Sequence, residues 1–327
     1  MFNNLFYTMR HPELYHGHGR RAPYFEGWYY KLVSADESRR IAIIPGVSLS
    51  GEAHAFVQVL NGVSGEAVYH RYPLADFHAE PRAFEVRVGP NLFRRDRIIL
   101  DIQRAEGQVQ GELHFTGLKP WPVSWFAPGI MGWYAWVPFM ECYHGVLSLD
   151  HRIYGTLQLN GSEADFNGGS GYIEKDWGQS FPAAWIWLQS NHFDQPRVSL
   201  TASVAIIPWL GRAFPGFIVG LWHDGRLYRF TTYLGAQIEQ LALDDQAVVW
   251  HLRNRRYQLH LHAQRAAGGA LAGPTKLDMG QRVQETLSAT VEVQLSTAEG
   301  HTLLHSRGRH AGLEVVGDLP RLLQMAR

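Results

Sequence analysis

The chain is poor in cysteine, since Cys142 is the only one among its 327 residues. A single thiol excludes an intrachain disulfide and any metal site built from several thiolates. Scarce cysteine is also typical of a reducing compartment, so we expect a cytoplasmic protein. The first ten residues lack the apolar run, followed by small residues, that marks a secretory signal.

Charge is scarce as well. Asp, Glu, Lys and Arg make up 18% of the chain, and 30 basic residues balance 30 acidic ones. Nucleic-acid binders need a basic surface to displace counterions, so we expect no nucleic-acid partner. The hydrophobic fraction of 46% is nevertheless that of a globular protein, and 13% of the residues are aromatic. This balance favours a flat, lipophilic small molecule as the ligand or substrate.

An uninterrupted apolar helix is also missing. Residues 120–140 contain no Asp, Glu, Lys or Arg and are about long enough to cross a bilayer. Their four prolines and two glycines, however, exclude a straight spanning helix, because proline removes an amide donor and clashes with the preceding turn. We therefore expect an apolar loop or lid here, one that can make peripheral contact with a membrane surface.

Short motifs of the first half return in the same order in the second half. The pairs are 28–30 (WYY) with 185–187 (WIW), 42–45 (AIIP) with 205–208 (AIIP), and 56–60 (FVQVL) with 217–221 (FIVGL). The offset is nearly constant at about 160 residues, which indicates an internal duplication. We expect one domain over residues 1–180, with an apolar insertion at 120–141, and a second over 181–327.

The repeated segments are typical of strands. Runs rich in β-branched and aromatic residues alternate with turn formers such as Asp224-Gly225, which is hairpin chemistry. The clearest runs are 199–207, 216–222, 227–233, 257–263 and 286–295. The only helix we expect is C-terminal, with Asp318 as its cap and Pro320 in its first turn. The sequence thus predicts an all-β chain of two tandem antiparallel barrels or sandwiches.

Carboxylates recur beside large aromatic rings. Side chains alternate along a strand, so Glu26 shares a face with Trp28 and Tyr30, and Glu174 shares one with Asp176. An apolar aromatic wall raises the pKa of a carboxyl group and makes it a general acid at neutral pH. The ring faces can also stabilise a developing cation.

Two further features complete the candidate site. Lys175 and Trp177 point away from Glu174, and a third segment sets four residues on one strand face: Trp185, Trp187, Gln189 and Asn191.

The alternative interpretation is that Glu26 and Glu174 are structural and pair with Lys31, Lys175 or an arginine. We expect hydrogen-bonded or solvated histidines, and therefore no metal site.

Segments 24–31 (YFEGWYYK) and 172–191 (YIEKDWGQSFPAAWIWLQSN) resemble the tocopherol cyclase family, with weaker similarity at 220–230, 273–275 and 311–317. The resemblance implies two lipocalin-like β domains, related to carotenoid hydratases and pericyclases. It also implies an isomerase that closes a chromanol ring on a prenylated hydroquinone, as in vitamin E biosynthesis, with no metal or redox cofactor.

That chemistry suits the candidate residues. The prenyl alkene is protonated, a tertiary cation forms, and the phenol oxygen traps it. We assign Glu174 or Glu26 as the acid and Asp176 as the proton acceptor. The proposed substrate-binding residues are Trp28, Tyr30, Trp177, Trp185 and Trp187 as an aromatic wall, with Gln189 and Asn191 holding the hydroquinone hydroxyls. A non-catalytic lipocalin-like carrier and a related alkene hydratase or pericyclase remain as alternatives.

Overall fold

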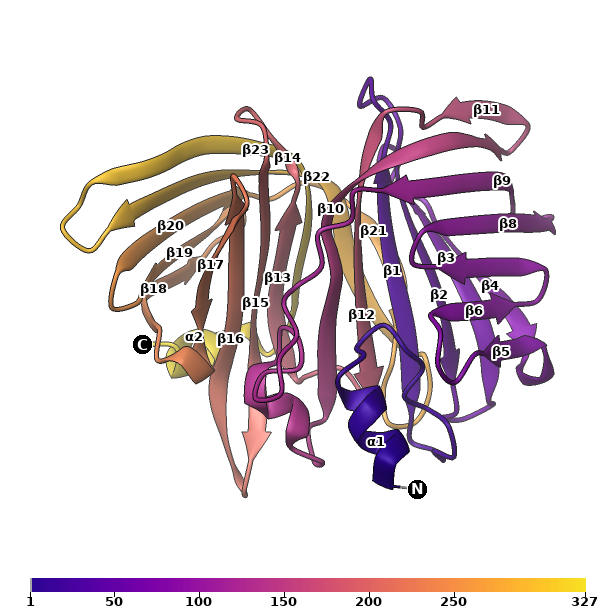
Figure 1. The fold of residues 1–327 in the computed structure, drawn as a ribbon, viewed down its shortest axis with the longest axis horizontal. Coiled ribbons are helices and arrows are strands. Elements are labelled where there is room, and N and C mark those ends of the chain that lie inside the picture. Colours follow the sequence, from indigo (N-terminus) through magenta and orange to yellow (C-terminus); the bar gives the residue numbers. More distant parts are fainter. Residues whose placement is uncertain (1) are drawn as a thin grey trace. The chain divides into compact units, whose positions relative to one another are not determined.

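The computed structural model describes residues 2–327 and is all-β, as predicted, with two antiparallel sheets (Figure 1) and two compact units. Unit 1 runs to Phe181 and includes Ala270–Arg282, whereas unit 2 comprises Pro182–Gly269 and Val283–Arg327. Residues 270–282, which the sequence analysis placed in the second domain, therefore lie with unit 1. Within that unit Gln58 Nε2 donates to the carbonyl of Ala272 at 2.9 Å, and Lys276 pairs with Glu141 at 3.0 Å.

The sheet of unit 1 has twelve strands. They are β1 (Phe25–Val33), β2 (Arg40–Ser48), β3 (His54–Asn61), β4 (Ala67–Pro73), β5 (Phe77–Ala79), β6 (Glu85–Val88), β7 (Asn91–Arg94), β8 (Arg97–Arg104), β9 (Gly107–Thr116), β10 (Cys142–Leu159), β11 (Ser162–Asp165) and β12 (Gly169–Gly178). Their order is β4-β3-β2-β1-β12-β10-β9-β8-β7-β6-β5, with β11 beside β10. The last long strand of the unit, β12, thus returns to pair with the first.

The second sheet has eleven strands. They are β13 (Ala184–Ser190), β14 (His192–Phe193), β15 (Val198–Trp209), β16 (Arg212–His223), β17 (Arg226–Thr231), β18 (Gln237–Leu243), β19 (Ala247–Arg253), β20 (Tyr257–Gln264), β21 (Gly269–Gly273), β22 (Gln281–Thr297) and β23 (Thr302–Gly317). The order is β17-β16-β15-β13-β23-β22-β20-β19-β18, with β14 on β23 and β21 on β22. The five strand segments expected from the sequence are present, although the one expected at 227–233 ends at Thr231 and continues as the 3-10 turn η3 (Thr232–Leu234).

The two sheets share one topology, as the duplicated motifs predict. In each, the first strand pairs on one side with the second long strand and on the other with the last: β1 with β2 and β12, and β13 with β15 and β23. The repeated motifs occupy equivalent strands, since the WYY and WIW motifs lie in β1 and β13 and the AIIP motifs in β2 and β15.

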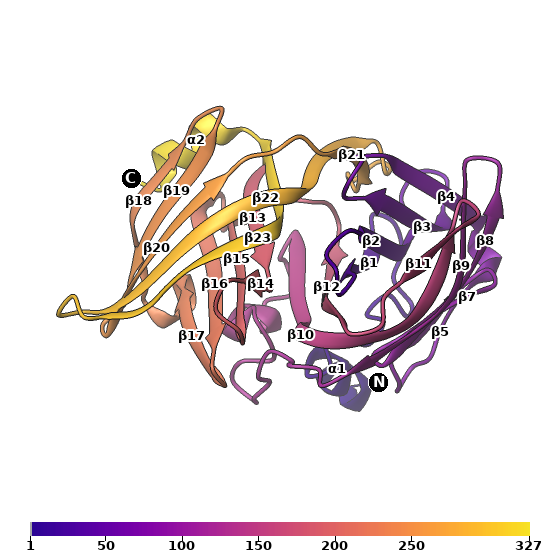
Figure 2. The ribbon, with the colours of Figure 1, turned by 90° about the horizontal axis from the view of Figure 1, so that it is seen from above.

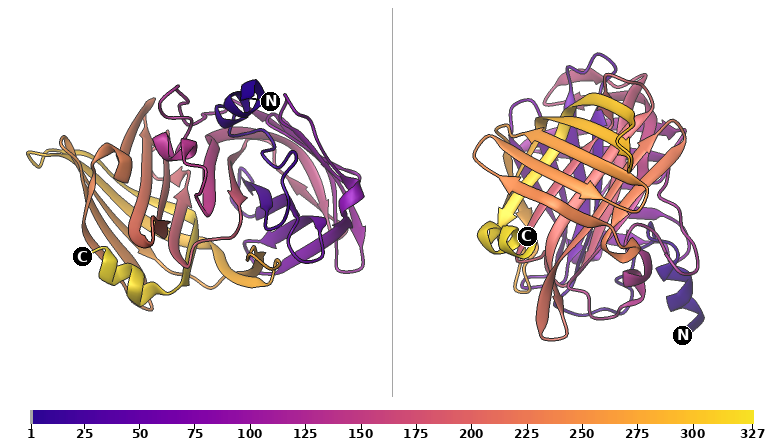
Figure 3. Two further views of the ribbon diagram at one scale, coloured as in Figure 1. Left: turned by 90° about the horizontal axis from the view of Figure 1, so that it is seen from below. Right: turned by 90° about the vertical axis from the view of Figure 1, so that its left-hand side faces the viewer.

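Each sheet bends around its own apolar core. In unit 1 the sheet curls round (Figure 2), and its inward side chains include fully buried Ile43, Val57 and Phe93. In unit 2, β20 continues the sheet beside β22, and β18, β19 and β20 cross in front of β15 and β16 (Figure 3, right) over a core that includes Val219 and Leu261. The alternate residues of β13, among them Ile186 and Leu188, belong to this second core.

Helices occupy the chain ends. The expected C-terminal helix is α2 (Leu319–Met325), where the Asp318 carboxylate accepts the N–H of Arg321 at 3.3 Å and Pro320 lies in the first turn. The sequence analysis missed α1 (Phe2–Met9), a second helix with no charged residue. The apolar stretch expected as a loop connects β9 to β10 and contains the 3-10 turn η2 (Gly132–Trp136) and an isolated bridge between Val123 and Pro128. Across residues 2–327, the helices are too short or too polar to cross a membrane.

Candidate active site

The register between β1 and β12 sorts the candidate residues of unit 1 onto two faces. Trp28 lies opposite Lys175, and Tyr29 lies opposite Glu174. Directly paired residues point to the same side of a sheet. Because Trp28 belongs to the core of unit 1, Lys175 also faces the core, whereas Tyr29 and Glu174 face away from it. Glu26 alternates with Trp28, so the two candidate acids lie on opposite faces of one sheet.

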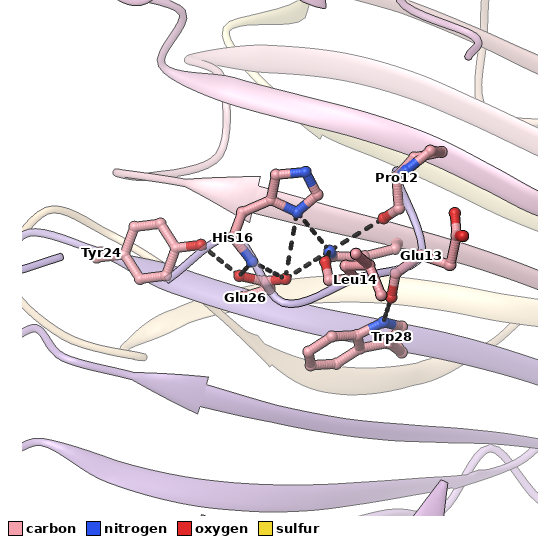
Figure 4. Close-up of polar contacts among 8 residues, drawn as sticks. Pro12, Glu13, Leu14, His16, Tyr24, Glu26 and Trp28 are labelled. Carbon is pink, nitrogen blue, oxygen red and sulfur yellow. Dashed lines mark hydrogen bonds and ion pairs between the residues drawn. The ribbon is translucent and has the colours of Figure 1, made fainter. Parts of the chain in front are cut away.

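On the core face, Glu26 and Lys175 form a fully buried ion pair (Figure 4, where the lysine is the side chain without a label). The ammonium nitrogen lies 2.5 Å from Glu26 Oε1, and both side chains are 0% exposed. The backbone N–H of His16 donates to both carboxylate oxygens, at 3.0 and 2.9 Å, and the Tyr24 hydroxyl donates to Oε2. Each oxygen of Glu26 therefore already has at least two protein partners.

The ammonium group of this ion pair also anchors the segment between α1 and β1. It donates to the carbonyl of Pro12 at 3.0 Å, to the carbonyl of Leu14, and to Nδ1 of His16 at 2.8 Å. The indole N–H of Trp28 donates to the carbonyl of Glu13 at 3.1 Å. Residues 12–16 are thus held against the core face of the sheet, as the side chains in Figure 4 show.

The charge of the lysine decides the protonation state of Glu26. Burial alone would raise the pKa of this carboxyl group, but the Lys175 ammonium and the hydrogen bonds from His16 and Lys175 outweigh it and lower the pKa below its ordinary value. The prediction that aromatic surroundings keep Glu26 protonated at neutral pH is therefore wrong. The ion pair of Glu26 with Lys175 is the arrangement that the alternative interpretation described.

The aromatic residues on this face enclose that ammonium group. Its nitrogen lies 4.9 Å from the ring centroid of Trp28 and 4.6 Å from that of Trp177, and the ring of His16 stacks on Trp177 with centroids 4.3 Å apart. Tyr30 is fully buried and donates to the carbonyl of Arg94 at 3.0 Å. Three of the five rings predicted as a substrate wall thus lie on the opposite sheet face from Glu174, and two of them, Trp28 and Trp177, stabilise a cation of the protein itself.

On the opposite face, β10 and β12 bring a histidine to the two remaining carboxylates. His144 is the register partner of Asp176. Its Nδ1 lies 2.8 Å from Asp176 Oδ1, and its Nε2 lies 3.7 Å from Glu174 Oε2. The Tyr172 hydroxyl donates to Glu174 Oε2 at 2.5 Å. We call His144, Tyr172, Glu174 and Asp176 the acid–base cluster.

The acid–base cluster is sheltered but reachable. The side chains of His144 and Asp176 are 15% and 29% exposed, and that of Glu174 is 6% exposed. Burial alone would lower the pKa of His144, but the carboxylates of Asp176 and Glu174 raise it from 6.5 to about 9. At neutral pH the cluster therefore holds an imidazolium proton next to a carboxylate.

This imidazolium makes stability depend on pH. A pKa that folding raises from 6.5 to about 9 stabilises the fold fully below the unfolded value, and the contribution disappears as the pH rises through the folded value. We expect the free energy of unfolding in urea to fall by on the order of 3 kcal/mol between about pH 6 and pH 10 on this account. The His144→Gln variant should lack this decline, and an unchanged decline in the variant would contradict the assignment.

The same side chains form a donor set that could hold a metal ion, because one atom from each of His144, Glu174 and Asp176 lies within 4.8 Å of the others. The sequence analysis expected no such group. Two of its donors, however, are already engaged: Asp176 Oδ1 by the Nδ1 of His144, and Glu174 Oε2 by the Tyr172 hydroxyl. These contacts already place a proton at each of the two oxygens, an arrangement that suits proton transfer.

The remaining predicted site residues belong to unit 2. Trp185, Trp187 and Gln189 are buried and alternate with the core residues of β13, so they share the sheet face that points away from that core, as expected. The Trp185 indole N–H donates to Glu314 Oε2 at 2.5 Å. Asn191 lies just past the end of β13, and its Oδ1 is 3.0 Å from the Nδ1 of its neighbour in the chain.

Sequence reasoning missed His144 and did not single out Tyr29. Strand alternation could have found Tyr29, since it separates Trp28 from Tyr30 and must face the other way. No local signal marks His144, because its partner Asp176 is 32 positions away and only the register of β10 on β12 joins them.

The fold and the acid–base cluster define a class: two lipocalin-like antiparallel β units, one of which carries a histidine between carboxylates. A family profile described as tocopherol cyclase-like matches residues 106–317, more than half of the chain. The chain belongs to this family, as the resemblance of its motifs indicated.

Two plant tocopherol cyclases are similar to this chain in sequence. The chloroplastic tocopherol cyclase of Zea mays is 26% identical over 199 residues, which are 57% of this chain and 41% of that protein. A probable chloroplastic tocopherol cyclase of Oryza sativa subsp. japonica is 26% identical over the same length, and the match covers 42% of it. The matched region thus spans less than half the length of these relatives.

Solved structures share the fold. CghA, crystallised with Sch210972, superposes with a TM-score of 0.55 at 12% identity, over 90% of this chain and 89% of that one. Kievitone hydratase from Nectria haematococca does so with a TM-score of 0.50 at 10% identity, over the same fractions. At these identities the likeness concerns the fold alone.

Proposed function

We propose that this protein is an acid–base isomerase that cyclises a prenylated hydroquinone, or a similar lipophilic prenyl or terpenoid substrate, to a chromanol-type ring. One observation carries the proposal: the acid–base cluster places an imidazolium next to the carboxylate of Glu174 on a partly exposed sheet face. Family membership supports the same reaction class.

Substrate binding would create the acid. An apolar molecule lying over His144 and Asp176 displaces water, and desolvation favours neutral groups over charged ones. The proton on His144 Nε2 then moves across the 3.7 Å gap to Glu174 Oε2, which yields a carboxylic acid and a neutral imidazole. Asp176 acts as a positioning residue, because its contact with Nδ1 fixes the ring so that Nε2 faces Glu174.

The reaction then needs two proton transfers and one ring closure. The O–H bond of Glu174 breaks as its proton adds to the prenyl alkene, which leaves a tertiary cation and a carboxylate. The neighbouring phenol oxygen forms the new C–O bond, and the phenol proton passes to the neutral Nε2 of His144. The protein regains its initial protonation state, and the product is an isomer of the substrate. A positioned acid contributes about 10²–10⁴-fold to such a step.

Substrate contacts on this face include rings other than those first expected. Tyr29 lies opposite Glu174 in the β1–β12 register, and Tyr172 touches its carboxylate, so two phenol rings border the reacting group. We keep Trp185, Trp187, Gln189 and Asn191 of unit 2 as proposed substrate-binding residues.

A second reaction is compatible with the same acid. Because His144 and Asp176 are partly exposed, water could reach the cation and trap it, which would make the protein an alkene hydratase. A lipocalin-like carrier would bind the same molecules and leave them unchanged.

Incubation with a methylated, prenylated hydroquinone in D2O tests these possibilities. We expect a chromanol of unchanged composition that carries one deuterium at the former alkene carbon, as detected by chromatography and mass spectrometry. Chelator should not affect turnover if the cluster transfers protons, whereas loss of turnover with chelator and its return with a divalent ion would assign the cluster to a metal.

Other outcomes identify the alternatives. A product heavier by one molecule of water would assign the hydratase reaction. Tight binding of several prenylated aromatics without any conversion would favour the carrier and contradict the isomerase.

A further inference from the structure

Unit 1 exposes an unusual group of apolar side chains that play no part in the acid–base cluster. Phe126 and Trp125 are 87% and 62% exposed, and Phe6 of helix α1 is 51% exposed. Tyr7 and Val123 are also exposed. We call these five residues, together with Trp136 beneath them, the aromatic patch. Single exposed apolar residues are ordinary, but a cluster of large ones indicates a binding surface.

The aromatic patch is held together by contacts between helix α1 and the β9–β10 connection. The rings of Phe6 and Trp136 lie 5.6 Å apart, and the guanidinium carbon of Arg10 lies 3.9 Å from the ring centroid of Trp125. The Trp136 indole N–H donates to the carbonyl of Trp125 at 3.2 Å. These contacts hold Phe6 and Trp125 in place before any partner binds, which lowers the entropic cost of docking.

The charge beside Trp125 is positive. Residues 120–140 carry no acidic group, and Arg10 lies directly on Trp125. Glu13, an acidic residue close to Arg10 in the chain, is paired with His11 at 3.0 Å. The nearby acid Glu141 is already paired with Lys276 at 3.0 Å.

Exposed aromatic side chains next to a positive charge favour a lipid bilayer as the partner. Tryptophan and phenylalanine side chains enter the headgroup region of bilayers readily, and adjacent arginines are attracted to anionic lipids. Two copies of the same surface would both present Arg10 to the interface, and like charges there disfavour self-association. The prolines of the connection also keep its backbone irregular, so it can lie on a membrane but not cross it.

We propose that the aromatic patch docks unit 1 onto the surface of an anionic lipid bilayer, with Trp125 and Phe126 entering the headgroup layer and Arg10 contacting lipid phosphates. This inference rests on exposure, ring contacts and charge, and it stands whether or not the proposed reaction is correct. If both hold, the patch would place the protein on the phase in which a lipophilic substrate is dissolved.

Flotation with vesicles tests the proposal. We expect the protein to float with vesicles of phosphatidylcholine and phosphatidylglycerol, more weakly with phosphatidylcholine alone, and less at high salt. The double variant Trp125→Ser/Phe126→Ser should lose at least about tenfold in vesicle affinity, because it removes two large apolar side chains. Arg10→Gln should weaken binding to anionic vesicles only.

The matched control is Leu277→Ser. Leu277 also belongs to unit 1 and is 78% exposed, but it lies outside the patch. Its substitution should leave flotation unchanged, and thermal unfolding should be unaffected in all three variants. Equal losses in the control and the double variant, or no flotation of the parent protein, would overturn the proposal. So would a concentration-dependent dimer, measured by light scattering, that the double variant abolishes, because the partner would then be a second copy.

Discussion

Replacing Lys175 by methionine is expected to lower the free energy of unfolding by about 3–5 kcal/mol. The substitution leaves the Glu26 carboxylate charged and fully buried without its cation, 2.5 Å from where the ammonium lay. It also removes the donor that holds the carbonyls of Pro12 and Leu14. Urea unfolding measures the loss, and trypsin should cleave more rapidly at Arg20 as residues 12–16 are released.

Two further variants show whether the loss of stability comes from the unpaired buried charge. The surface ion pair of Lys276 with Glu141 is a matched control: its lysine side chain is 56% exposed, so Lys276→Met should cost less than about 1 kcal/mol. The double variant Glu26→Gln/Lys175→Met should lose less than the two single variants combined, because it leaves no uncompensated charge. A Lys175→Met protein as stable as Lys276→Met would refute the structural role of the pair.

Replacing Glu174 by glutamine is expected to lower turnover of a verified substrate by about 10²–10⁴-fold with little effect on stability. The amide keeps the size of the side chain but cannot deliver a proton. His144→Gln should cause a loss of similar size, because it removes the group that reloads Glu174. Steady-state kinetics and deuterium incorporation in D2O measure both effects.

A second His–Glu pair of unit 1 provides the control for this experiment. His114 Nε2 lies 3.1 Å from Glu112 Oε1, with side chains 54% and 39% exposed. Glu112→Gln and His114→Gln should turn over like the parent protein. Asp176→Asn should retain part of the activity but shift its pH profile, since it removes one of the charges that raise the pKa of His144. Full turnover in Glu174→Gln would exclude Glu174 as the acid.

The two experiments also separate the two candidate acids. Glu26→Gln is expected to affect stability and to leave turnover of the remaining folded protein nearly intact, whereas Glu174→Gln is expected to do the reverse. The distinction follows from the opposite faces on which β1 and β12 present the two carboxylates. Sequence motifs alone made them equivalent, because each carboxylate lies one or two positions from a large ring.

Much of the site could be predicted from the sequence because strand geometry is local. The period of two placed Glu26 with Trp28 and Tyr30, and it separated Glu174 and Asp176 from Lys175, as the sheet of unit 1 bears out. The period of two does not show which of the two strand faces turns toward the core of the unit. Both faces of β12 combine aromatic and charged residues, so composition does not show which one turns toward the core.

By itself, the amino-acid sequence determined the all-β class, the duplication, the C-terminal helix and the sorting of residues onto strand faces. Turn chemistry, side-chain alternation and repeated motifs act over a few residues or recur visibly along the chain. Only the tertiary structure decided that Lys175 neutralises Glu26 and that His144 joins Asp176 and Glu174. Those contacts depend on the register of strands far apart in the chain, which the packing of a whole sheet fixes.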